Sequence, residues 1–371
     1  MTKPAVELPA MDVPARAERL RASAEAAGCD ALLVTHLTNI RYLTGFTGSA
    51  ALLVVTPSAF TFVTDGRYEE QATGQLGAAG VDAEIVIGRS AALQQAVVTE
   101  RMADIGRVGL EAEHVTWADQ HRYAAEWFPG AELVATSGIV EQLRIVKDDG
   151  EVARIEAAGG IADAALAAIA PLLEKRPTEA AFALALDTEM RRRGADDISF
   201  ETIVAAGPNG SRPHHTPSPR AIERGDLVVV DFGALVDGYH SDMTRTIAVG
   251  GPGALDATQA RMVSVVREAQ AAGVAAVRAG ANTRDVDAAC RDVIAAAGWA
   301  DAFVHGTGHG VGLDVHEEPR VSWAADATLA PGHVVTVEPG VYLPGHGGVR
   351  IEDTVVVTES GCRPLTRAPK S

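Results

Sequence analysis

The sequence predicts two globular domains, a smaller α/β domain followed by an α+β domain. The chain has 371 residues, 47% of them hydrophobic, which is more than one core usually serves and too apolar to remain unfolded. Short apolar strands alternate with helices over about the first 140 residues, whereas the later helices and β-branched runs do not alternate regularly. A polar break at 147–151 (KDDGE) separates the two patterns, and we expect domains at 1–142 and 143–371.

In the first domain, apolar runs bounded by Gly, Pro and Asn predict short strands. Helices are expected at 12–28 and near 117–128. The predicted strands are 31–35, 51–55, 60–64, 84–87, 107–110 and 131–135. Their alternation with helices favours a parallel or mixed sheet.

In the second domain, capping residues delimit the helices. Asp148 or Asp149 can cap an Ala-rich helix, and Gly194 and Gly280 can end two later helices in a left-handed conformation. The first helix is expected to reach about residue 173, and the others to span 178–193 and about 255–279. β-branched runs predict strands at 201–205, 227–231, 244–249, 334–338 and 349–357.

Charge and cysteine usage exclude several classes of protein. The formal net charge is −17, from 32 Lys and Arg against 49 Asp and Glu, and without a basic patch such a chain repels nucleic acid. Cys29, Cys290 and Cys362 lack the paired spacing of a zinc or redox motif and indicate free thiols in a reducing compartment. No apolar run reaches signal-peptide or membrane-spanning length. We therefore expect a cytoplasmic protein that binds neither nucleic acid nor a membrane.

Two aspartates flank a predicted hairpin with an Asp-Gly turn at 237–238. With that turn, Asp231 lies opposite Thr244, and Asp231 and Asp242 share one face as diagonal neighbours, about 7–8 Å apart at Cα. Asp231 ends an apolar run, where an unpaired charge is costly to bury, so a cation between the two carboxylates would meet that need. The alternative is a pair of ordinary strand-end or turn aspartates.

Three histidines fall within the Gly-rich segment 305–317 (HGTGHGVGLDVHE). His305, His309 and His316 come from only 11 histidines in the chain, and imidazole is the commonest metal ligand and proton carrier. The glycines allow close backbone approach, so the imidazoles can converge at a site. The segment lacks the frames of a P-loop or a dinucleotide-binding loop, while a plain surface loop stays open as an alternative.

Two later strands each carry one carboxylate among β-branched residues. Alternation places Glu338 on the face of Thr336, and Glu352 on the face of Arg350, away from the apolar side. Taken singly, each is typical of a solvated face. Taken together, two Asp, two Glu and one His suit a pair of divalent ions, and four carboxylates balance their charge. Water between two such ions would be acidified for attack on a carbonyl or phosphoryl centre, so we predict hydrolysis.

Four segments of the second domain resemble the signature blocks of the pita-bread metallopeptidases, in the prolidase and aminopeptidase P branch. They are 229–246 (VVDFGALVDGYHSDMTRT), 305–317, 334–342 (VVTVEPGVY) and 348–357 (GVRIEDTVVV). The segments 39–55 (NIRYLTGFTGSAALLVV) and 64–72 (TDGRYEEQA) likewise resemble the creatinase-like N-terminal domain of that branch. The resemblance implies a pita-bread catalytic domain preceded by a creatinase-like α/β domain.

The resemblance also implies two divalent metal ions, with Mn²⁺ expected and Co²⁺, Zn²⁺ or Fe²⁺ as alternatives. The implied ligands are Asp231, Asp242, His309, Glu338 and Glu352. Asp242 and Glu352 are expected to bridge the ions, and Glu338 to move a proton between the bridging hydroxide and the leaving amine. The presence of all five ligands argues against creatinase, which needs no metal, and against the inactive members of the fold.

Further residues take roles by the same resemblance. His214, His305 and His316 correspond to groups that hold the substrate and stabilise the oxyanion. His215 is the alternative to His214, which we choose because the family places its His directly after a Pro or an apolar residue. Arg350 is expected to donate hydrogen bonds to the metal carboxylates, with a plain surface arginine as the alternative.

In this branch the scissile bond precedes proline, whose tertiary amide ordinary peptidases bind poorly. The implied partner is a proline-containing peptide, and the N-terminal domain is expected to close over a neighbouring subunit's site in a homodimer. We expect a Xaa-Pro aminopeptidase, because 45–50 (GFTGSA) resembles short bacterial proteins of that kind. The alternatives are a Xaa-Pro dipeptidase (prolidase) and a non-catalytic peptide-binding member of the fold.

Overall fold

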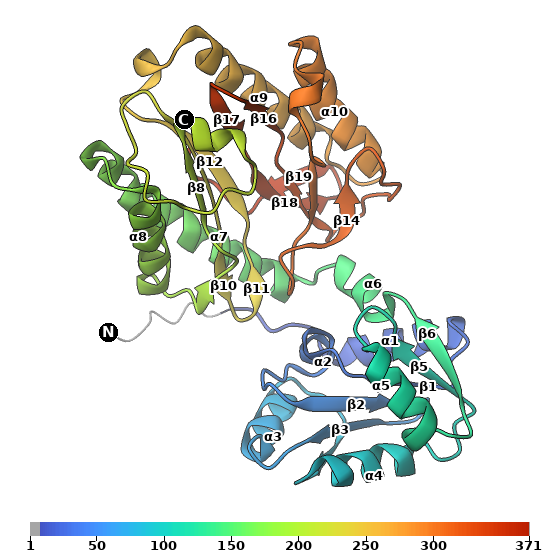
Figure 1. Ribbon diagram of the computed structural model, residues 1–371. Coiled ribbons are helices and arrows are strands. Elements are labelled where there is room, and N and C mark those ends of the chain that lie inside the picture. Colours follow the sequence, from blue (N-terminus) through green and yellow to red (C-terminus); the bar gives the residue numbers. More distant parts are fainter. Residues whose placement is uncertain (1–7, 371) are drawn as a thin grey trace. The chain divides into compact units, whose positions relative to one another are not determined.

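The computed structural model describes residues 8–370 (Figure 1). Residues 10–144 form one compact unit, and residues 145–370 together with 8–9 form another. The fold class predicted from the sequence, an α/β part followed by a mixed helix-and-hairpin part, is confirmed.

A six-stranded mixed sheet forms the centre of the N-terminal unit, in the order β4-β3-β2-β1-β5-β6. The strands are β1 (Ala31–Val34), β2 (Ala51–Val55), β3 (Phe60–Thr64), β4 (Glu84–Ile87), β5 (Arg107–Glu111) and β6 (Glu132–Thr136). β2 runs antiparallel to β1 and β3, whereas the outer pairs are parallel. All six predicted strands are present, and the expected mixed sheet is confirmed.

The helices of this part are more numerous than the sequence predicts. They are α1 (Pro14–Ala26), α2 (Leu37–Thr44), α3 (Glu69–Ala78), α4 (Ala91–Arg101), α5 (Trp117–Arg122) and α6 (Ile139–Ile145). The predicted helix at 117–128 is α5 continued by a π-helical turn to Trp127. α2, α3, α4 and α6 are not predicted, because α2 and α6 are short and α3 contains two glycines that weaken its helical propensity.

The first half of the C-terminal unit packs two helices against short strands. α7 (Asp149–Ile169) begins with a capping box between Asp148 and Glu151, and α8 (Glu179–Arg192) is capped by Thr178. α8 ends before Gly194, whose φ of 109° fits the predicted stop. The strands form two sheets, β12-β9-β8 and β11-β10-β7. Their bounds are β7 (Asp197–Ile198), β8 (Ile203–Ala206), β9 (Leu227–Phe232), β10 (Ala234–Val236), β11 (Tyr239–His240) and β12 (Met243–Ala248).

The second half repeats the pairing of two helices with a sheet. α9 (Ala257–Ala276) packs against α10 (Thr283–Ala296), beside a five-stranded sheet of order β14-β13-β15-β18-β19 (Figure 1). The strands are β13 (Gly308–Gly310), β14 (Glu317–Val321), β15 (Val334–Val337), β18 (Asp353–Thr358) and β19 (Gly361–Pro364). A separate hairpin pairs β16 (Gly340–Leu343) with β17 (Gly347–Arg350).

Two predictions for this half are wrong in detail. The helix expected at about 255–279 ends at Ala276, because Val277 is extended, and Gly280 lies in the turn before α10 instead of at a helix end. α10 itself, capped by Asn282, is not predicted. The strand expected at 349–357 is interrupted at 351–352, where the chain leaves β17 and enters β18.

Within the described residues, α7 together with the turn that follows it to Lys175 is long and apolar enough to cross a membrane by length and composition alone. It packs against α8 and β10, and Ala158, Ala162 and Ala165 lie fully buried in the core of this half. One face of α7 therefore contributes to this core.

The hairpin register predicted around Asp231 is confirmed. Asp231 pairs with Thr244, and Asp237 and Gly238 form the turn with φ values of 46° and 75°, which the tight turn between twisted strands requires. Both acids of the hairpin, Asp231 and Asp242, thereby face the same side.

Side-chain and backbone hydrogen bonds join the two halves where β12 meets the end of β17. Glu352 N donates to Thr244 O at 3.1 Å, and the Thr246 hydroxyl donates to Arg350 O at 2.8 Å. The Thr354 hydroxyl donates to Asp242 O at 2.8 Å. The carboxylates of Asp242 and Glu352 come from different halves and are brought together at this seam.

Candidate metal centre and active site

A cavity of about 630 Å³ opens at the seam between the two halves of the C-terminal unit. Its walls include every site residue expected from the sequence, namely Asp231, Asp242, His309, Glu338, Glu352, Arg350, His214, His305 and His316. His215, the alternative to His214, also lines it. Residues that are more than 130 positions apart in the sequence thus share one cavity.

The five residues expected as ligands form a tight polar cluster. One ligand atom each from Asp242, His309 and Glu352 lies within 4.8 Å of the others. His309 Nε2 is 3.3 Å from Glu338 Oε1 and 3.6 Å from Asp242 Oδ2. Asp231 completes the set from β9, on the same face of the hairpin as Asp242.

Hydrogen bonds orient the imidazole of His309. Its Nδ1 lies 2.9 Å from Gly310 O, so Nδ1–H donates to that carbonyl and Nε2 faces the carboxylates. The Thr336 hydroxyl accepts from His309 N at 3.1 Å and donates to Glu338 Oε1 at 3.2 Å. An Nε2 aimed at carboxylate oxygens has the direction a metal ligand needs.

The glycines of β13 allow this approach. A Cβ added at Gly308 would lie 2.0 Å from Thr336 O, which is a backbone atom and cannot yield cheaply. Glycine at this position therefore lets β13 lie close enough to β15 for His309 to reach Glu338.

We expect Gly308→Ala to lower the free energy of unfolding by about 1–3 kcal/mol and to reduce metal affinity, because β13 must move away from β15. Chemical denaturation and metal titration measure the two effects. Gly160→Ala in α7 is the matched control, since nothing lies within 4 Å of its added Cβ, and it should leave both quantities unchanged or raise stability. Unchanged metal affinity in Gly308→Ala would contradict the role given to the close approach.

Crowding of carboxylates dominates the electrostatics of the cluster. Burial raises the pKa of Asp231, Asp242 and Glu352, and neighbouring carboxylates raise them further. Burial alone would also raise the pKa of Glu338, but His309, His305 and Arg350 lower it to about 2. Without a cation, the site therefore opposes ionisation of three of its four acids.

Two buried oxygen atoms in the cluster have no hydrogen-bond partner among the described residues, Asp231 Oδ1 and Glu352 Oε1. A buried carboxylate oxygen without a donor is costly, and a divalent cation supplies the missing partner. With one oriented imidazole and four carboxylates, the donor set fits a pair of divalent ions.

Arg350 is the one guanidinium within the cluster. It is buried, and its Nη2 lies 2.6 Å from Asp231 Oδ2 while its Nη1 lies 2.8 Å from Tyr342 Oη. Its Nε donates to the Thr244 hydroxyl at 3.0 Å, and that hydroxyl donates to Glu352 Oε2 at 2.7 Å. The surface-arginine alternative does not apply, because Arg350 holds two of the cluster's carboxylates, one directly and one through Thr244.

We expect Arg350→Lys to lower metal affinity or kcat/KM by about 10- to 100-fold, because one ammonium cannot replace the donors that reach Asp231, Tyr342 and Thr244 together. Metal titration and steady-state kinetics test this. Arg363→Lys, which alters an exposed pair with Glu156, is the control and should retain wild-type values. Equal behaviour of the two variants would contradict a supporting role for Arg350.

The three histidines expected to contact substrate differ in their surroundings. His316 is exposed as a residue, but its ring packs edge-on against His309 with centroids 4.4 Å apart, and this partial desolvation together with the neighbouring His309 lowers its pKa to about 4. His305 is bonded to Gly306 O and to Tyr342 Oη, each at 2.8 Å. His316 can therefore meet a substrate directly as a neutral imidazole, whereas His305 is engaged in the cavity wall.

His214 and His215 differ in burial and in their contacts. His215 is buried and its Nε2 lies 2.8 Å from Glu179 Oε2. His214 is exposed at the cavity. The geometry favours the choice of His214 as the substrate-facing residue.

Sequence reasoning did not single out Tyr342 or Thr244 as parts of the site. Tyr342 Oη accepts from Arg350 and can donate to His305, and Thr244 links Arg350 to Glu352. The hairpin register was the available signal for Thr244, since it pairs with Asp231. No comparable signal exists for Tyr342, because its link to Arg350 depends on the pairing of β16 with β17.

Each of the two units matches a known protein family. Residues 153–359 match the metallopeptidase family M24, and residues 16–146 match the creatinase/prolidase N-terminal domain. The chain is 44% identical to an uncharacterized peptidase of Bacillus subtilis, YqhT, over 95% of this chain and 98% of that protein.

Solved structures give the same assignment. A Xaa-Pro dipeptidase from Bacillus anthracis superposes with a TM-score of 0.91 at 39% identity, covering 97% of this chain and 99% of that one. An X-Pro aminopeptidase from Thermotoga maritima superposes with a TM-score of 0.86 at 33% identity, covering 94% and 99%. With its cluster of one imidazole and four carboxylates, this chain belongs to metallopeptidase family M24 and carries a creatinase/prolidase-type N-terminal domain.

Proposed function

We propose that this chain is a metal-dependent exopeptidase that hydrolyses the peptide bond before proline, releasing the first residue of Xaa-Pro peptides as an aminopeptidase. The observation that carries the proposal is the convergence of five ligand-type side chains on one cavity, two of them with buried oxygen atoms that have no hydrogen-bond partner within residues 8–370. Membership of family M24 and the Xaa-Pro peptidases among its relatives support the substrate class.

Two divalent ions would be held by Asp231, Asp242, His309, Glu338 and Glu352. Once bound, the pair would supply an acidified water for attack on the scissile carbonyl. We propose Mn²⁺ as the native ion, with Co²⁺, Zn²⁺ or Fe²⁺ as alternatives, because the oxygen-rich set favours harder ions.

The protein's own groups position the reactants and move the proton. Glu338, whose pKa of about 2 keeps it ionised, takes the proton from the attacking water and delivers it to the proline nitrogen as the bond breaks. His316 and His214 face the cavity and can donate hydrogen bonds to the carbonyl oxygen as its negative charge grows. His305 acts through Tyr342, and Arg350 keeps Asp231 in place.

A Xaa-Pro dipeptidase is the second candidate, and one residue favours it. Arg320 lies in the cavity wall, is half exposed, and forms a long ion pair of 3.9 Å with Glu318. A guanidinium there could pair with the C-terminal carboxylate of a bound dipeptide. Dipeptidases also stand among the curated and solved relatives.

The remaining assignments belong to the same proposal. We propose that residues 143–371 form the catalytic domain, and that residues 1–142 limit substrate length at a neighbouring subunit's site in a homodimer. The three distant cysteines, all free, are consistent with a reducing cytoplasm. The partner is a proline-containing peptide, and the net charge of −17 disfavours nucleic acid.

The deciding experiment compares a Xaa-Pro dipeptide with a Xaa-Pro-Xaa tripeptide, using protein stripped with a chelator and resupplied with Mn²⁺, Co²⁺ or Zn²⁺. Cleavage of the tripeptide before its proline supports the aminopeptidase, and cleavage of the dipeptide alone supports the dipeptidase. In the second case, Arg320→Leu should raise KM for the dipeptide. Absence of cleavage with every metal would overturn the proposed function in favour of a peptide-binding protein.

A further inference from the structure

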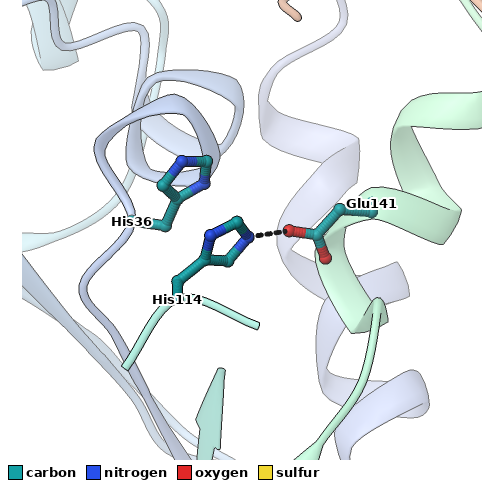
Figure 2. A group of neighbouring side chains, drawn as sticks. All are labelled: His36, His114 and Glu141. Atoms are coloured by element: carbon teal, nitrogen blue, oxygen red, sulfur yellow. Dashed lines mark hydrogen bonds and ion pairs between the residues drawn. The ribbon is translucent and has the colours of Figure 1, made fainter. Parts of the chain in front are cut away.

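A second group of metal-binding side chains lies wholly within the N-terminal unit, apart from the cavity described above (Figure 2). His36 immediately precedes α2, His114 follows β5, and Glu141 belongs to α6. One ligand atom of each lies within 4.8 Å of the others, and all three side chains are partly exposed. An ion could therefore reach the group from solvent.

The arrangement of the three side chains suits a cation. The two imidazole rings stack face to face, with centroids 3.6 Å apart and an interplanar angle of 4°. His114 Nε2 lies 2.9 Å from Glu141 Oε1, so an imidazole nitrogen and a carboxylate oxygen already face each other. Imidazole and carboxylate groups are common ligands of divalent ions.

Neighbouring hydrogen bonds hold the group in place. Asn39 Nδ2 donates to Glu141 Oε1 at 2.6 Å and to Glu111 Oε1 at 2.8 Å. Glu111 Oε2 accepts from the backbone N–H of His36 at 2.9 Å. The backbone beside one imidazole and the carboxylate of Glu141 are thus tied to a common support, as is usual around metal ligands.

We propose that His36, His114 and Glu141 form a separate site for one divalent ion of the Zn²⁺ and Co²⁺ class. His114 Nε2 and Glu141 Oε1 are 2.9 Å apart, which suits two ligands that each lie about 2.0–2.2 Å from one ion. A ligand atom of His36 lies within 4.8 Å of both. Two imidazoles and one carboxylate favour softer ions than the oxygen-rich cluster of the C-terminal unit.

The test counts bound Co²⁺ per chain. Full-length protein is stripped with a chelator, equilibrated with Co²⁺, passed through a desalting column and analysed by mass spectrometry for metal. His114→Ala and Glu141→Gln should each bind one ion fewer than the wild type and retain its peptidase activity. His121→Ala, which removes an exposed imidazole on nearby α5, is the matched control and should bind the wild-type number.

The metal count does not depend on whether the chain cleaves peptides, so this test is independent of the proposed function. Loss of one Co²⁺ in both variants but not in His121→Ala supports the site. A wild-type Co²⁺ count in either variant would overturn it, as would an equal loss in the control.

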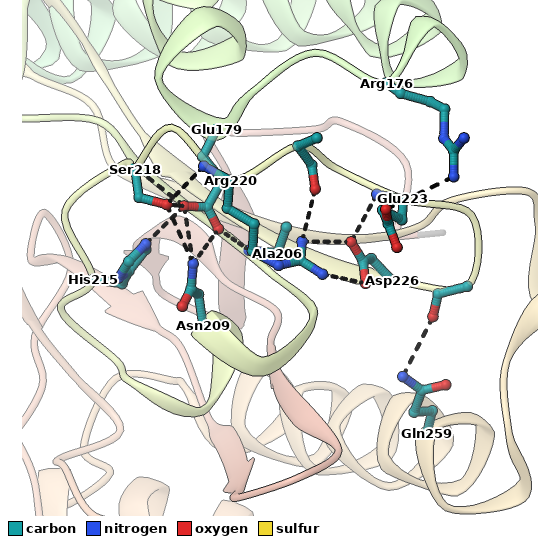
Figure 3. Close-up of polar contacts among 12 residues, drawn as sticks. Arg176, Glu179, Ala206, Asn209, His215, Ser218, Arg220, Glu223, Asp226 and Gln259 are labelled. Atoms are coloured by element: carbon teal, nitrogen blue, oxygen red, sulfur yellow. Dashed lines mark hydrogen bonds and ion pairs between the residues drawn. The ribbon is translucent and has the colours of Figure 1, made fainter.

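A second inference concerns Glu179, a buried carboxylate at the start of α8 (Figure 3). Its side chain is fully buried. It accepts hydrogen bonds from Ala206 N at 2.8 Å, Asn209 Nδ2 at 2.9 Å, His215 Nε2 at 2.8 Å, Ser218 N at 3.0 Å and Ser218 Oγ at 2.5 Å. All of these donors belong to the segment 206–218.

The same segment forms one wall of the cavity. Pro213, His214, His215, Thr216 and Pro217 all line it. A buried carboxylate is stable only when hydrogen-bond donors satisfy its oxygens, and the donors to Glu179 among the described residues come from this loop. The position of the wall therefore depends on the acceptor at residue 179.

We infer that Glu179 is a positioning residue that fixes segment 206–218 so that His214 faces the cavity. This inference rests on the proposed function, in which His214 contacts the substrate. Glutamine has nearly the same shape, but its amide would direct hydrogen atoms at groups that are themselves donors.

The test combines a measurement of loop order with kinetics on Glu179→Gln. Amide exchange of the peptide covering 207–218, followed by mass spectrometry, should become at least about 10-fold faster, which reports loop order without any activity. The kcat for a Xaa-Pro peptide should fall with metal content unchanged. Asp163→Asn, which weakens the hold of a carboxylate on Arg367 N and Ala368 N in the same unit, is the control and should keep both loop exchange and kcat.

Faster loop exchange together with a lower kcat supports the inference. Unchanged loop exchange overturns it, and so does faster exchange with an unchanged kcat. If the wild type cleaves no Xaa-Pro peptide, the proposed function fails instead, and the exchange measurement still decides whether Glu179 orders the loop.

Discussion

Asp242→Asn is expected to abolish hydrolysis and at the same time to make the metal-free protein more stable at neutral pH. Asp242 is 5% exposed, and burial together with Glu352 and Asp231 raises its pKa well above the ordinary value. The substitution removes one of four crowded carboxylates and thereby reduces the electrostatic repulsion among them in the metal-free site. It also takes away one of the oxygen ligands that would hold the ions.

The pH dependence of stability follows from the direction of the shifts. In the metal-free folded state, the raised pKa values of Asp231, Asp242 and Glu352 mean that these groups bind protons more tightly than in the unfolded chain. Their contribution to stability is fully present below the pKa of an unfolded carboxyl and is lost as pH rises through the raised values. Glu338, with its pKa of about 2, acts in the opposite sense, and its contribution is lost only as pH falls toward that value.

Denaturation with urea in the presence of a chelator, at about pH 5 and about pH 8, measures these effects. The wild type should lose stability between the two values, and Asp242→Asn should lose less. At the higher pH we expect the metal-free variant to have the higher free energy of unfolding, because it lacks a buried carboxylate whose pKa is raised by burial and neighbouring acids. With saturating Mn²⁺, the wild type should become more stable than the variant, because it gains free energy from metal binding that the variant lacks.

Asp237→Asn is the matched control for this prediction. It makes the same chemical change at the turn of the same hairpin, on a side chain that is 43% exposed, and Asn tolerates the left-handed backbone at that position. It should keep wild-type activity and the wild-type pH profile. Retained activity in Asp242→Asn, or a metal-free variant less stable than wild type at about pH 8, would contradict our account of the centre.

The parts of the site that could be predicted from sequence depend on local signals. The Asp-Gly turn and strand alternation determine the register of Asp231 with Thr244, because a two-residue turn leaves one pairing that keeps the apolar residues on one face. The ligand identities came from resemblance in four short segments. These segments carry their chemistry in fixed spacing, which survives when the rest of the sequence changes.

The parts that could not be predicted depend on long-range contacts. Alternation placed Glu352 on the face of Arg350 in one continuous strand, but the chain bends at 351–352 because Glu352 N pairs with Thr244 O, a residue 108 positions away. Glu179 gave no functional signal, since a Glu in the first turn of a helix is ordinarily read as a favourable helix end. Its role depends on the hydrogen-bond donors of segment 206–218, which only the folded chain brings around its carboxylate.

Glu338→Gln is expected to lower kcat by about 10²- to 10⁴-fold while the protein stays folded. Glutamine keeps an oxygen for metal binding but cannot accept and return a proton. His309, His305 and Arg350 hold the pKa of Glu338 at about 2, so the group is an ionised acceptor over the whole working range.

A change of leaving group separates proton transfer from metal binding as the source of this loss. The proline nitrogen must be protonated to leave, whereas a nitrophenolate leaves as a stable anion. An activated nitrophenyl ester should therefore recover at least about 10-fold of the loss in Glu338→Gln. Metal analysis must show the same ion content as wild type, and Glu318→Gln, an exposed neighbour of the cavity, should behave as wild type toward both substrates. An equal loss with peptide and ester would mean that Glu338 serves as a ligand and base but does not protonate the leaving group.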